Sequence, residues 1–369
     1  MNDGRTRVNR ERFRLIVAGG GTGGHFFPGL AVAQAVVALQ PDAEVLFVGS
    51  ARGIEARLAP RNGFPFKALP ASGFASVGAA ARVRALASVP AALALGLGTL
   101  LQSKPHAVLG VGGYASVPMG LAAGLAGIPL ILLEQNVSPG LANRLLSRFA
   151  ALVAVAFPQT KTAFRGKGRL LGNPVRASLT AVPPESGPER PFRLLVFGGS
   201  GGASALNAAL EEALPALRAF PGGVEILHQT GEKDLERVRT AYEGSGIPAR
   251  VEPFLHDMDR AYAWCHACVC RAGATTLAEI AAARRPALLV PFPHAAGGHQ
   301  SANARGMEEL GGAIRIEQAD LTTGILMEAL GRLAERTVRE RMARALGKAA
   351  RPDAARAIAE YVLLAGGRP

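Results

Sequence analysis

A glycine-rich turn between an apolar run and a helix-like segment constrains this chain most strongly, and it occurs twice. The first turn, GGGTGGHFFPG over residues 19–29, follows the apolar run Leu15–Ala18. The second, Gly198–Gly202, follows the run RLLVF. Glycines between a buried strand and a helix let backbone N–H groups approach an anion. The sequence therefore predicts two loops suited to phosphate groups, one in each half of the chain.

The order strand, glycine turn, helix recurs along both halves. RLIVAGGGTGG leads into PGLAVAQAVVAL, and AVLGVGGYAS precedes PMGLAAGLAG. A stretch rich in Pro, Ser and charge, near residues 173–191, interrupts the pattern, which then restarts. Short apolar runs that alternate with helices predict an α/β fold with parallel, doubly wound sheets. We expect two Rossmann-like domains, and a length of 369 residues fits two domains better than one.

The first turn matches the dinucleotide fingerprint G-x-G-x-x-G at Gly19, Gly21 and Gly24. A dinucleotide site also needs an acidic residue at the end of the second strand, about twenty positions on. The second strand here is AEVLFVGS; it ends in Val-Gly-Ser, and the nearest acids precede it. The missing acid argues against a nicotinamide cofactor and leaves an anion-binding loop of another kind.

His25 stands where this turn meets the following helix, and Pro28 suits the first turn of that helix. A helix N-terminus disfavours the imidazolium, which keeps a histidine neutral and able to accept a proton. Two interpretations remain open from position alone. His25 is a general base, or it holds the loop through a hydrogen bond.

The charge of the chain is uneven. The formal net charge of +13 belongs to residues 1–184, which hold 19 basic and 6 acidic residues, whereas residues 185–369 hold 22 of each. A one-sided basic field indicates an anionic partner, although a solubilising surface is the alternative. Stacking aromatics and a reading motif for nucleic acid are missing, so we expect no nucleic-acid partner and favour an anionic lipid or a phosphorylated substrate.

One uncharged stretch reaches the length of a membrane span. It covers residues 85–103, but a proline and two glycines interrupt it and alanine outnumbers leucine. We therefore expect no transmembrane helix. An apolar patch with Arg82, Arg84 and Lys104 at its margins fits the surface of an anionic leaflet instead.

The second half carries two further polar motifs. In CRAGATTLAEIAA, a strand ends at Arg271 and a helix begins near Thr275, which places Glu279 in its first turns. This carboxylate can accept both hydroxyls of a ribose, or it only complements the helix dipole. The loop over residues 291–304 offers Gln300 and Asn303, whose amides suit sugar hydroxyls or stabilise the loop itself.

The three cysteines, Cys265, Cys268 and Cys270, indicate neither a disulfide framework nor a metal site. Their spacing lacks a second ligand pair, and the last two fall on an apolar strand. Buried, reduced thiols in a cytoplasmic protein are the expected state.

Several motifs occur together and in order across nearly the whole chain. They are GGGTGGHFFPGLAVA, GVGGYAS, LLEQN, GNPVR, GGSGGA, VCRAGATTLAEI and PFPHAA with the following HQ. Taken together they resemble the MurG family of bacterial peptidoglycan N-acetylglucosaminyltransferases. Only the basic N-terminal tail and the interrupting stretch fall outside the resemblance.

The resemblance implies a GT-B glycosyltransferase fold, in which two Rossmann-like domains face each other across a cleft. We expect an N-terminal acceptor domain over residues 1–176, a linker over 177–191 and a UDP-GlcNAc-binding domain over 192–351, with the helix of 352–369 returning to the first domain. The implied reaction is an inverting transfer without a metal or other cofactor. It moves GlcNAc from UDP-GlcNAc to the C4 hydroxyl of the MurNAc of lipid I, giving lipid II and UDP. The implied location is the cytoplasmic face of the inner membrane, peripheral and on an anionic surface.

The resemblance also implies roles for individual residues. His25 is the candidate general base, and Tyr114 and Gly21 lie on the acceptor side. The implied UDP-GlcNAc contacts are Thr22, Gly23, Gly24, Asn136, Arg176, Ser200, Leu255, Ala274, Thr275, Thr276, Glu279 and Gln300. Within this set, Arg176 and Ser200 meet the diphosphate and Glu279 holds the ribose. Three positions depart from the family pattern: Gly201, His256 and the pair Gly297–Gly298.

Two other functions share these features. One is a different UDP-sugar enzyme of the same architecture, such as a glycolipid synthase or an epimerase. The other is a basic, membrane-bound nucleotide-sugar sensor without catalysis.

Overall fold

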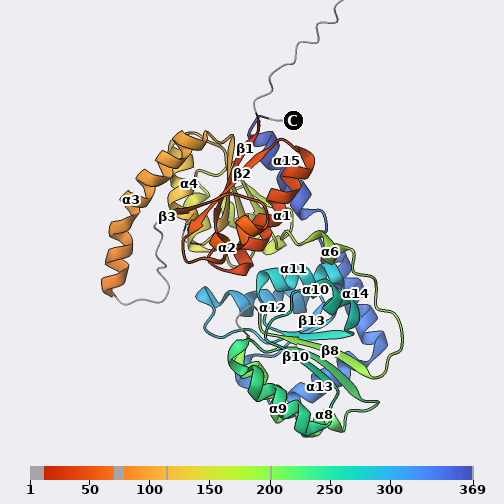
Figure 1. Ribbon diagram of the computed structural model, residues 1–369. Helices are drawn as coiled ribbons and strands as arrows, with labels where there is room; N and C mark the ends of the chain where they lie inside the picture. Colours follow the sequence, from red (N-terminus) through yellow and green to blue (C-terminus); the bar gives the residue numbers. More distant parts are fainter. Residues whose placement is uncertain (1–11, 70–78, 114, 200–201, 368–369) are drawn as a thin grey trace, which may run out of the picture. The chain divides into compact units, whose positions relative to one another are not determined.

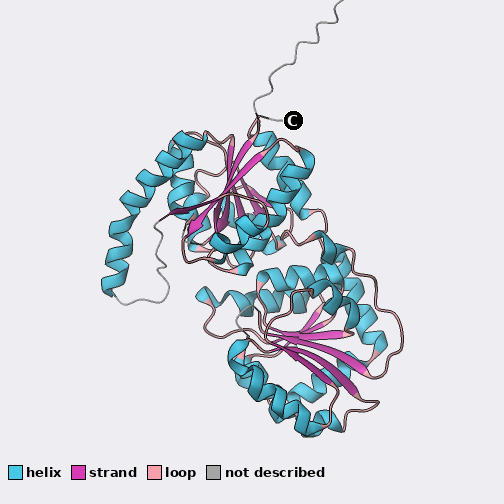
Figure 2. Cartoon of the chain, viewed as in Figure 1, coloured by secondary structure: helices cyan, strands magenta, loops and turns pink. Residues whose placement is uncertain are grey.

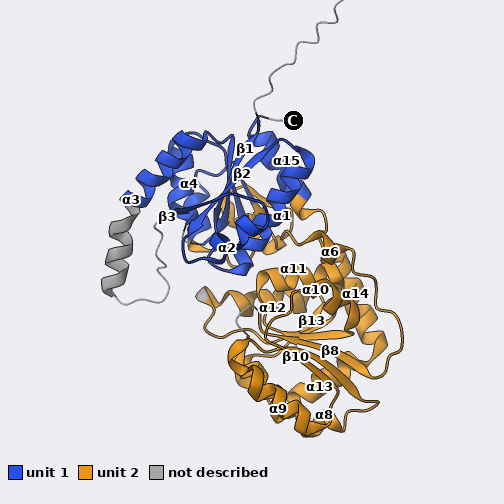
Figure 3. Ribbon diagram, viewed as in Figure 1, with its two compact units in different colours: residues 1–133, 142–153, 356–369 blue, residues 134–141, 154–355 orange. Residues whose placement is uncertain are grey.

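The computed structural model describes residues 12–69, 79–113, 115–199 and 202–367 (Figure 1). Contacts divide the chain into two compact units, shown in different colours in Figure 3. Unit 1 comprises residues 1–133, 142–153 and 356–369, and unit 2 comprises residues 134–141 and 154–355. In each unit, helices flank both sides of a sheet (Figure 2).

The first sheet has seven strands in the order β3-β2-β1-β4-β5-β6-β7. β1 pairs in parallel with β2 and β4, and the outer pairs β2–β3 and β4–β5 are also parallel. The strands are β1 (Arg14–Gly19), β2 (Glu44–Ser50), β3 (Phe66–Leu69), β4 (Ala107–Gly112), β5 (Leu130–Glu134), β6 (Leu152–Val155) and β7 (Gly168–Leu170).

The helices of this part of the chain alternate with its strands. They are α1 (Gly23–Leu39), α2 (Ile54–Arg61), α3 (Ala79–Ser103), α4 (Ser116–Leu125), α5 (Leu141–Leu146) and the short 3₁₀ helix η1 (Pro158–Phe164). The last helix of the chain, α15 (Ala354–Ala365), belongs to unit 1 from residue 356 onward.

The second sheet repeats the same plan with six parallel strands in the order β10-β9-β8-β11-β12-β13. The strands are β8 (Phe192–Phe197), β9 (Val224–Gln229), β10 (Ala249–Glu252), β11 (Ala267–Cys270), β12 (Ala287–Leu289) and β13 (Ala313–Arg315). In both sheets the first strand of the series lies centrally and the order reverses beside it, as in Rossmann folds. The predicted pair of doubly wound sheets is confirmed.

The helices around this sheet are mostly short. They are α6 (Ala177–Thr180), α7 (Ser204–Glu212), α8 (Leu214–Arg218), α9 (Leu235–Ser245), α10 (Met258–Trp264), α11 (Ala274–Ala283), α12 (His299–Glu309), α13 (Thr323–Ala334) and α14 (Arg336–Ala349), with 3₁₀ turns η2 (Glu232–Asp234), η3 (Ala296–Gly298) and η4 (Gln318–Asp320).

Alternate residues of β8 show why this strand is apolar from Leu194 to Phe197. Leu194 and Val196 pack into one core with residues of α7, α9 and α13, whereas Leu195 and Phe197 pack into a second core with residues of α10, α11 and α12. A parallel sheet that is covered on both faces needs apolar side chains in both directions. The strand therefore lacks the alternation of apolar and polar residues that is typical of a strand with one solvent-exposed face.

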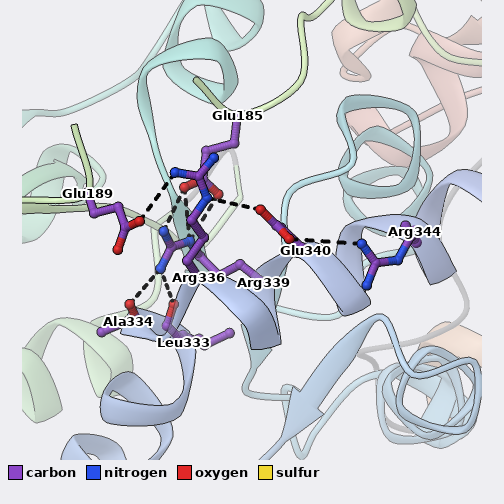
Figure 4. Close-up of polar contacts among 8 residues, drawn as sticks. All are labelled: Glu185, Glu189, Leu333, Ala334, Arg336, Arg339, Glu340 and Arg344. Carbon is purple, nitrogen blue, oxygen red and sulfur yellow. Dashed lines mark hydrogen bonds and ion pairs between the residues drawn. The ribbon is translucent and has the colours of Figure 1, made fainter. Parts of the chain in front are cut away.

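A buried ion pair fixes the segment over residues 177–191 to α14 (Figure 4). The fully buried Arg339 donates to Glu185, with Nη2–Oε1 at 2.7 Å and Nε–Oε2 at 2.9 Å. Its Nη1 donates to the carbonyl groups of Leu333 and Ala334. Burial raises the pKa of Glu185, but the Arg339 guanidinium outweighs it, so this pKa lies below its ordinary value. Removal of either partner would leave the other charge unpaired.

Candidate functional site

The first glycine turn joins β1 to α1 in a conformation that side chains resist. Gly19 has a φ of +128°, and a Cβ placed on it would collide with the carbonyl oxygen of Gly112 at the end of β4. The N–H of Gly20 donates to that same oxygen at 3.2 Å. Glycine is therefore required because two backbone segments touch here.

Glu55, which the sequence analysis missed, stabilises this turn through hydrogen bonds to the backbone. Its side chain is buried, Oε2 accepts from the N–H of Gly21 at 2.7 Å, and Oε1 accepts from the N–H of Ser50 at 2.9 Å. A Cβ on Gly20, Gly49 or Gly53 would collide with this carboxyl group. Glu55 thus connects the end of β2 to the turn after β1.

His25 lies in the first turn of α1, half-buried. Its Nδ1 is 3.3 Å from the hydroxyl of Thr22, and its backbone N–H donates to the carbonyl oxygen of Thr22 at 3.2 Å. A Cβ on Gly112 would lie 2.8 Å from Cδ2 and 3.0 Å from Nε2 of His25. The imidazole therefore occupies space that only a glycine at the end of β4 leaves open.

The placement of Pro28 in the first turn of the helix was wrong. The helix begins at Gly23, directly after Thr22 in an extended conformation, so Pro28 lies in the helix interior and is buried. Tyr114, which the resemblance places on the acceptor side, lies outside the described residues, whereas Gly21, Thr22 and Gly24 are exposed in the turn and Gly23 is partly exposed.

In unit 2, β11 and α11 position the predicted ribose carboxylate. Gly273 precedes α11 in an extended conformation and supplies no capping side chain. Ala274, Thr275 and Thr276 follow it in the first turn, all partly exposed. The N-terminus of a helix favours an anion, and these three residues form that end of α11.

Glu279 lies one turn further along α11, close to two polar side chains. Its Oε1 is 3.8 Å from Nη2 of Arg176, and its Oε2 accepts from the hydroxyl of Tyr262 at 3.3 Å. Burial raises the pKa of Glu279 to about 7, against the lowering effects of Arg176 and of the Tyr262 hydrogen bond. The structure thus brings the predicted residues Arg176 and Glu279 together, and Glu279 can change its charge near neutral pH.

The second glycine turn follows β8, and Ser200 and Gly201 within it lie outside the described residues. Gln229, a buried residue that the sequence analysis also missed, links its described part to Leu255. Gln229 Nε2 donates to the carbonyl oxygen of Gly199 at 2.7 Å, and its Oε1 accepts from the N–H of Leu255 at 3.0 Å. One amide therefore links the described part of this turn to the backbone of Leu255, a predicted nucleotide contact.

The side-chain amide of Asn303 makes its hydrogen bonds inside the fold. It is fully buried in α12, which begins at His299 and shortens the predicted loop. Its Nδ2 donates to Asn136 Oδ1 at 3.2 Å, and its Oδ1 accepts from the N–H of Val137 at 2.9 Å. Contacts group Asn136 with unit 2. Gln300, in the first turn of α12, accepts from the N–H of Phe292 at 2.9 Å.

Arg271, at the end of β11, connects this part of unit 2 to the next strand end. Its Nη1 donates to the carbonyl oxygens of Val290 and Pro291 at 3.1 Å, and its Nη2 donates to Gln318 at 2.7 Å. Burial lowers the pKa of Arg271. The side chain thereby anchors the loop that leads to Gln300.

The cysteines are buried free thiols, as predicted. Burial raises the pKa of Cys270, beyond the range in which a thiolate forms near neutrality. Within the described ranges, no group of three or more His, Cys, Asp and Glu side chains is arranged to hold a metal ion.

Residues 79–103 form the single helix α3, which packs on α4. Across the parts of the chain that the structure describes, no helix has the length and hydropathy of a membrane span. Leu95 and Leu101 on α3 are 51% and 77% exposed, and Leu125 at the end of α4 is 65% exposed. An apolar surface therefore lies on these two helices of unit 1.

Comparison with known proteins matches both units. Residues 15–155 match the glycosyltransferase family 28 N-terminal domain and residues 193–358 the corresponding C-terminal domain. A protein of Syntrophotalea carbinolica is 46% identical over 326 residues, which cover 87% of this chain and 90% of the relative. One of Anaeromyxobacter sp. (strain Fw109-5) is 45% identical over 351 residues, covering 94% and 92%. Both are named UDP-N-acetylglucosamine--N-acetylmuramyl-(pentapeptide) pyrophosphoryl-undecaprenol N-acetylglucosamine transferase.

A solved structure agrees with these relatives. The crystal structure of Acinetobacter baumannii MurG superimposes with a TM-score of 0.79 at 31% identity, covering 95% of this chain and 99% of that one. The glycine turns, the Arg176–Glu279 pair and the two Rossmann-like sheets thus occur in a chain related to known UDP-sugar enzymes over nearly its whole length. The chain is a UDP-sugar glycosyltransferase that belongs to glycosyltransferase family 28 and, within it, to the MurG family.

Proposed function

We propose that this chain transfers GlcNAc from UDP-GlcNAc to the C4 hydroxyl of the MurNAc of lipid I, giving lipid II and UDP. The observation that carries the proposal is the Arg176–Glu279 pair at the start of α11, with 3.8 Å between Nη2 and Oε1. It joins a cation for a diphosphate to a carboxylate for a ribose, as a UDP-sugar requires. Relatives that are 45–46% identical over most of the chain carry the name of this transferase.

The remaining donor contacts follow the same assignment. Leu255 meets the uracil, with its backbone held by Gln229. Ala274, Thr275 and Thr276 line the nucleotide at the open start of α11, and Ser200 adds to the diphosphate contacts. Gln300 and Asn136 bind hydroxyls of the GlcNAc.

The proposed chemistry is a displacement at the anomeric carbon. The acceptor oxygen attacks this carbon from the face opposite UDP, the bond to the diphosphate oxygen breaks, and UDP leaves with the electron pair. His25 takes the proton of the attacking hydroxyl. The turn residues Thr22, Gly23 and Gly24 face the donor sugar, and Gly21 and Tyr114 serve the acceptor side. Arg176 and the N–H groups of α11 stabilise the charge on UDP without a metal ion.

The acceptor is a lipid, and unit 1 has features suited to a membrane surface. Exposed leucines lie on α3 and α4, in the half of the chain that carries the whole net charge. We propose that residues near 72–104 bind the anionic cytoplasmic face of the inner membrane, peripherally. Binding to anionic vesicles should weaken steeply with salt, and equal binding to neutral vesicles at high salt would contradict it. The proposed domains remain 1–176 with 352–369, and 192–351, joined by the linker 177–191.

Turnover with defined substrates tests the proposal. The full chain receives UDP-GlcNAc and a lipid I analogue in excess chelator, and the expected product is the disaccharide lipid with inverted anomeric configuration. No product, or product only after Mg²⁺ is added, would contradict it. Release of UDP without any acceptor would indicate an epimerase, and preference for another glycolipid acceptor a different synthase. Nucleotide-sugar binding without turnover would indicate a sensor.

A further inference from the structure

Unit 2 contains a cavity of about 530 Å³ that none of the proposed catalytic steps uses. It lies between α11, α14 and two chain segments, residues 156–158 and 170–175. The helices α11 and α14 are in contact. Cavities that bind small molecules usually have volumes of a few hundred to about 1,000 Å³ and are lined mainly by apolar side chains.

The floor of the cavity is apolar. One face of α11 contributes Leu277, Ala278 and Ala281, and α12 contributes Met307 and Leu310. Leu310 is 41% exposed although it follows the end of a helix that is otherwise packed on this unit. Small side chains on α11 leave room that larger ones would fill, so an apolar chain can lie along this helix.

One polar side chain in the wall is buried and unsatisfied. Asn173 is only 6% exposed, and neither its Nδ2 nor its Oδ1 has a hydrogen-bond partner within the described structure. A buried amide without hydrogen-bond partners destabilises the folded protein, because its polar atoms lose the water that solvates them in the unfolded chain. A ligand with a hydroxyl or ester group beside Asn173 would satisfy it.

The rim of the cavity is cationic. Arg341, Arg344, Lys348 and Arg351 line it, and no acidic residue does. Arg344 Nη1 is 4.0 Å from Glu340, and Arg351 donates to backbone carbonyls near the end of α14. Within the described residues, no ion pair is found for Arg341 or for Lys348, which lie seven positions apart on α14. Two cations on one helix face are thus available to an anion.

We propose that this cavity binds a single-chain amphipathic anion: an acyl chain on a phosphorylated glycerol-like head group. The chain lies on the apolar face of α11, a hydroxyl or ester group pairs with Asn173, and the phosphate meets Arg341 and Lys348. The cavity differs from the proposed donor site, because Glu279 points from another face of α11 and does not line it. Only Ala274, the first residue of α11, belongs to both. The site does not depend on the proposed transferase reaction.

Binding of lauroyl lysophosphatidic acid to the full chain, below its micelle concentration, tests the proposal by calorimetry. Glycerol phosphate presents the head alone and monolaurin the chain alone, and each should bind about tenfold or more weakly than the combined molecule. Saturating UDP should not displace the bound amphiphile. Equal binding of glycerol phosphate or of monolaurin, or full displacement by UDP, would overturn the proposal.

The double variant Arg341→Ala/Lys348→Ala should weaken binding about tenfold or more without changing the fold, because both side chains are exposed. The matched control is Arg218→Ala/Lys233→Ala, which removes two exposed cations of the same unit outside the cavity and should leave binding unchanged. If both double variants weakened binding of the amphiphile equally, the net charge of the protein and not this cavity would attract the anion, which would overturn the proposed site.

Asn173→Leu gives a second, independent readout. It should weaken binding while the melting temperature of the ligand-free protein stays equal or rises, because two unsatisfied polar atoms are removed. A lower melting temperature with unchanged affinity would show that Asn173 is structural and would contradict its role in the site.

Discussion

The two glycine turns have the same place in their sheets but are held by different chemistry. Under the first turn, the Glu55 carboxylate accepts from two N–H groups, those of Gly21 and Ser50. Under the second, the Gln229 amide donates to one carbonyl and accepts from one N–H. The backbone dictates the choice, because two donors need a carboxylate whereas a donor and an acceptor need an amide. The two turns thus have the same place in the fold, but the backbone groups beside each turn determine which type of side chain can hydrogen-bond to it.

The turns also differ in the proposed chemistry, which gives the largest expected effect. His25→Ala should lower kcat by about 10²–10⁴-fold, because the acceptor hydroxyl loses its base. UDP affinity should stay unchanged, because the proposed nucleotide contacts lie in unit 2. Steady-state kinetics and calorimetry with UDP measure the two quantities. If His25→Ala lost UDP binding but kept its kcat, His25 would be a nucleotide contact and not the base, which would contradict the proposed roles.

Exchange of carboxylate for amide under the first turn should have the next largest effect. In Glu55→Gln the new NH₂ group faces an N–H donor, so one buried hydrogen bond is replaced by an unpaired donor at a cost of about 1–3 kcal/mol. The free energy of unfolding, from urea titration, should fall by that amount, and kcat should fall with it. The control is Glu44→Gln, which changes an exposed carboxylate at the start of β2, the strand whose last residue bonds to Glu55. Equal stability of the two variants would mean that Glu55 does not support the turn.

The pKa of Glu279 makes the second unit sensitive to pH. The proposed ribose contact needs the carboxylate, so the KM for UDP-GlcNAc should rise as the pH falls below about 7, approaching tenfold per pH unit. Glu279→Gln should remove this dependence at the cost of a higher KM at pH 8. A wild-type KM that stays constant between pH 8 and pH 5.5 would contradict the ribose assignment.

The same group affects stability with a defined sign. Its pKa in the folded protein, about 7, exceeds the ordinary value of 4.5, so its stabilising contribution is complete below 4.5 and is lost as the pH rises to 7. The stability of the wild type relative to Glu279→Gln should therefore decrease from pH 4.5 to pH 7 and change little above it.

Exchange of amide for carboxylate under the second turn should have the smallest effect. Gln229→Glu places an oxygen against the carbonyl of Gly199, but Gly199 and Leu255 are partly exposed and can be solvated. We expect a loss of about 0.5–1.5 kcal/mol of stability and weaker UDP binding, measured by urea titration and calorimetry. A loss larger than that of Glu55→Gln would contradict the ranking of the two supports.

Most of the fold could be predicted from the sequence, because glycine turns after apolar runs mark several of the strand–helix junctions, such as those after β1, β4 and β8. The supports of the turns could not, since Glu55 and Gln229 are distant in sequence from the groups they bind. One signal was present. Between residues 45 and 184, where acids are scarce, the two acids are Glu55 and Glu134. Both are buried and accept from backbone N–H groups. A rare acid in a basic region is thus a candidate anchor for the backbone.

The site could be predicted only in part, because sequence patterns do not show which polar groups satisfy each other. Glu279 and Arg176, to which the resemblance assigns contacts with the same nucleotide, lie with Oε1 and Nη2 3.8 Å apart. Asn303 belongs to the same polar loop by sequence, yet its hydrogen bonds go to Asn136, Val137 and Ala272 inside the fold. The predicted place of Pro28 in the first turn of α1 was also wrong, because the helix already begins at Gly23.

The glycines around His25 restrict how relatives of this chain can diverge. A side chain at Gly112 would collide with the imidazole, and one at Gly113 would collide with the carbonyl oxygen of Gly20. Gly112 and Gly113 belong to the junction of β4 and α4, whereas Gly20 and His25 belong to the junction of β1 and α1, so a side chain at either glycine would push the two junctions apart. We therefore expect substitutions that change the acceptor to fall outside this corner of unit 1.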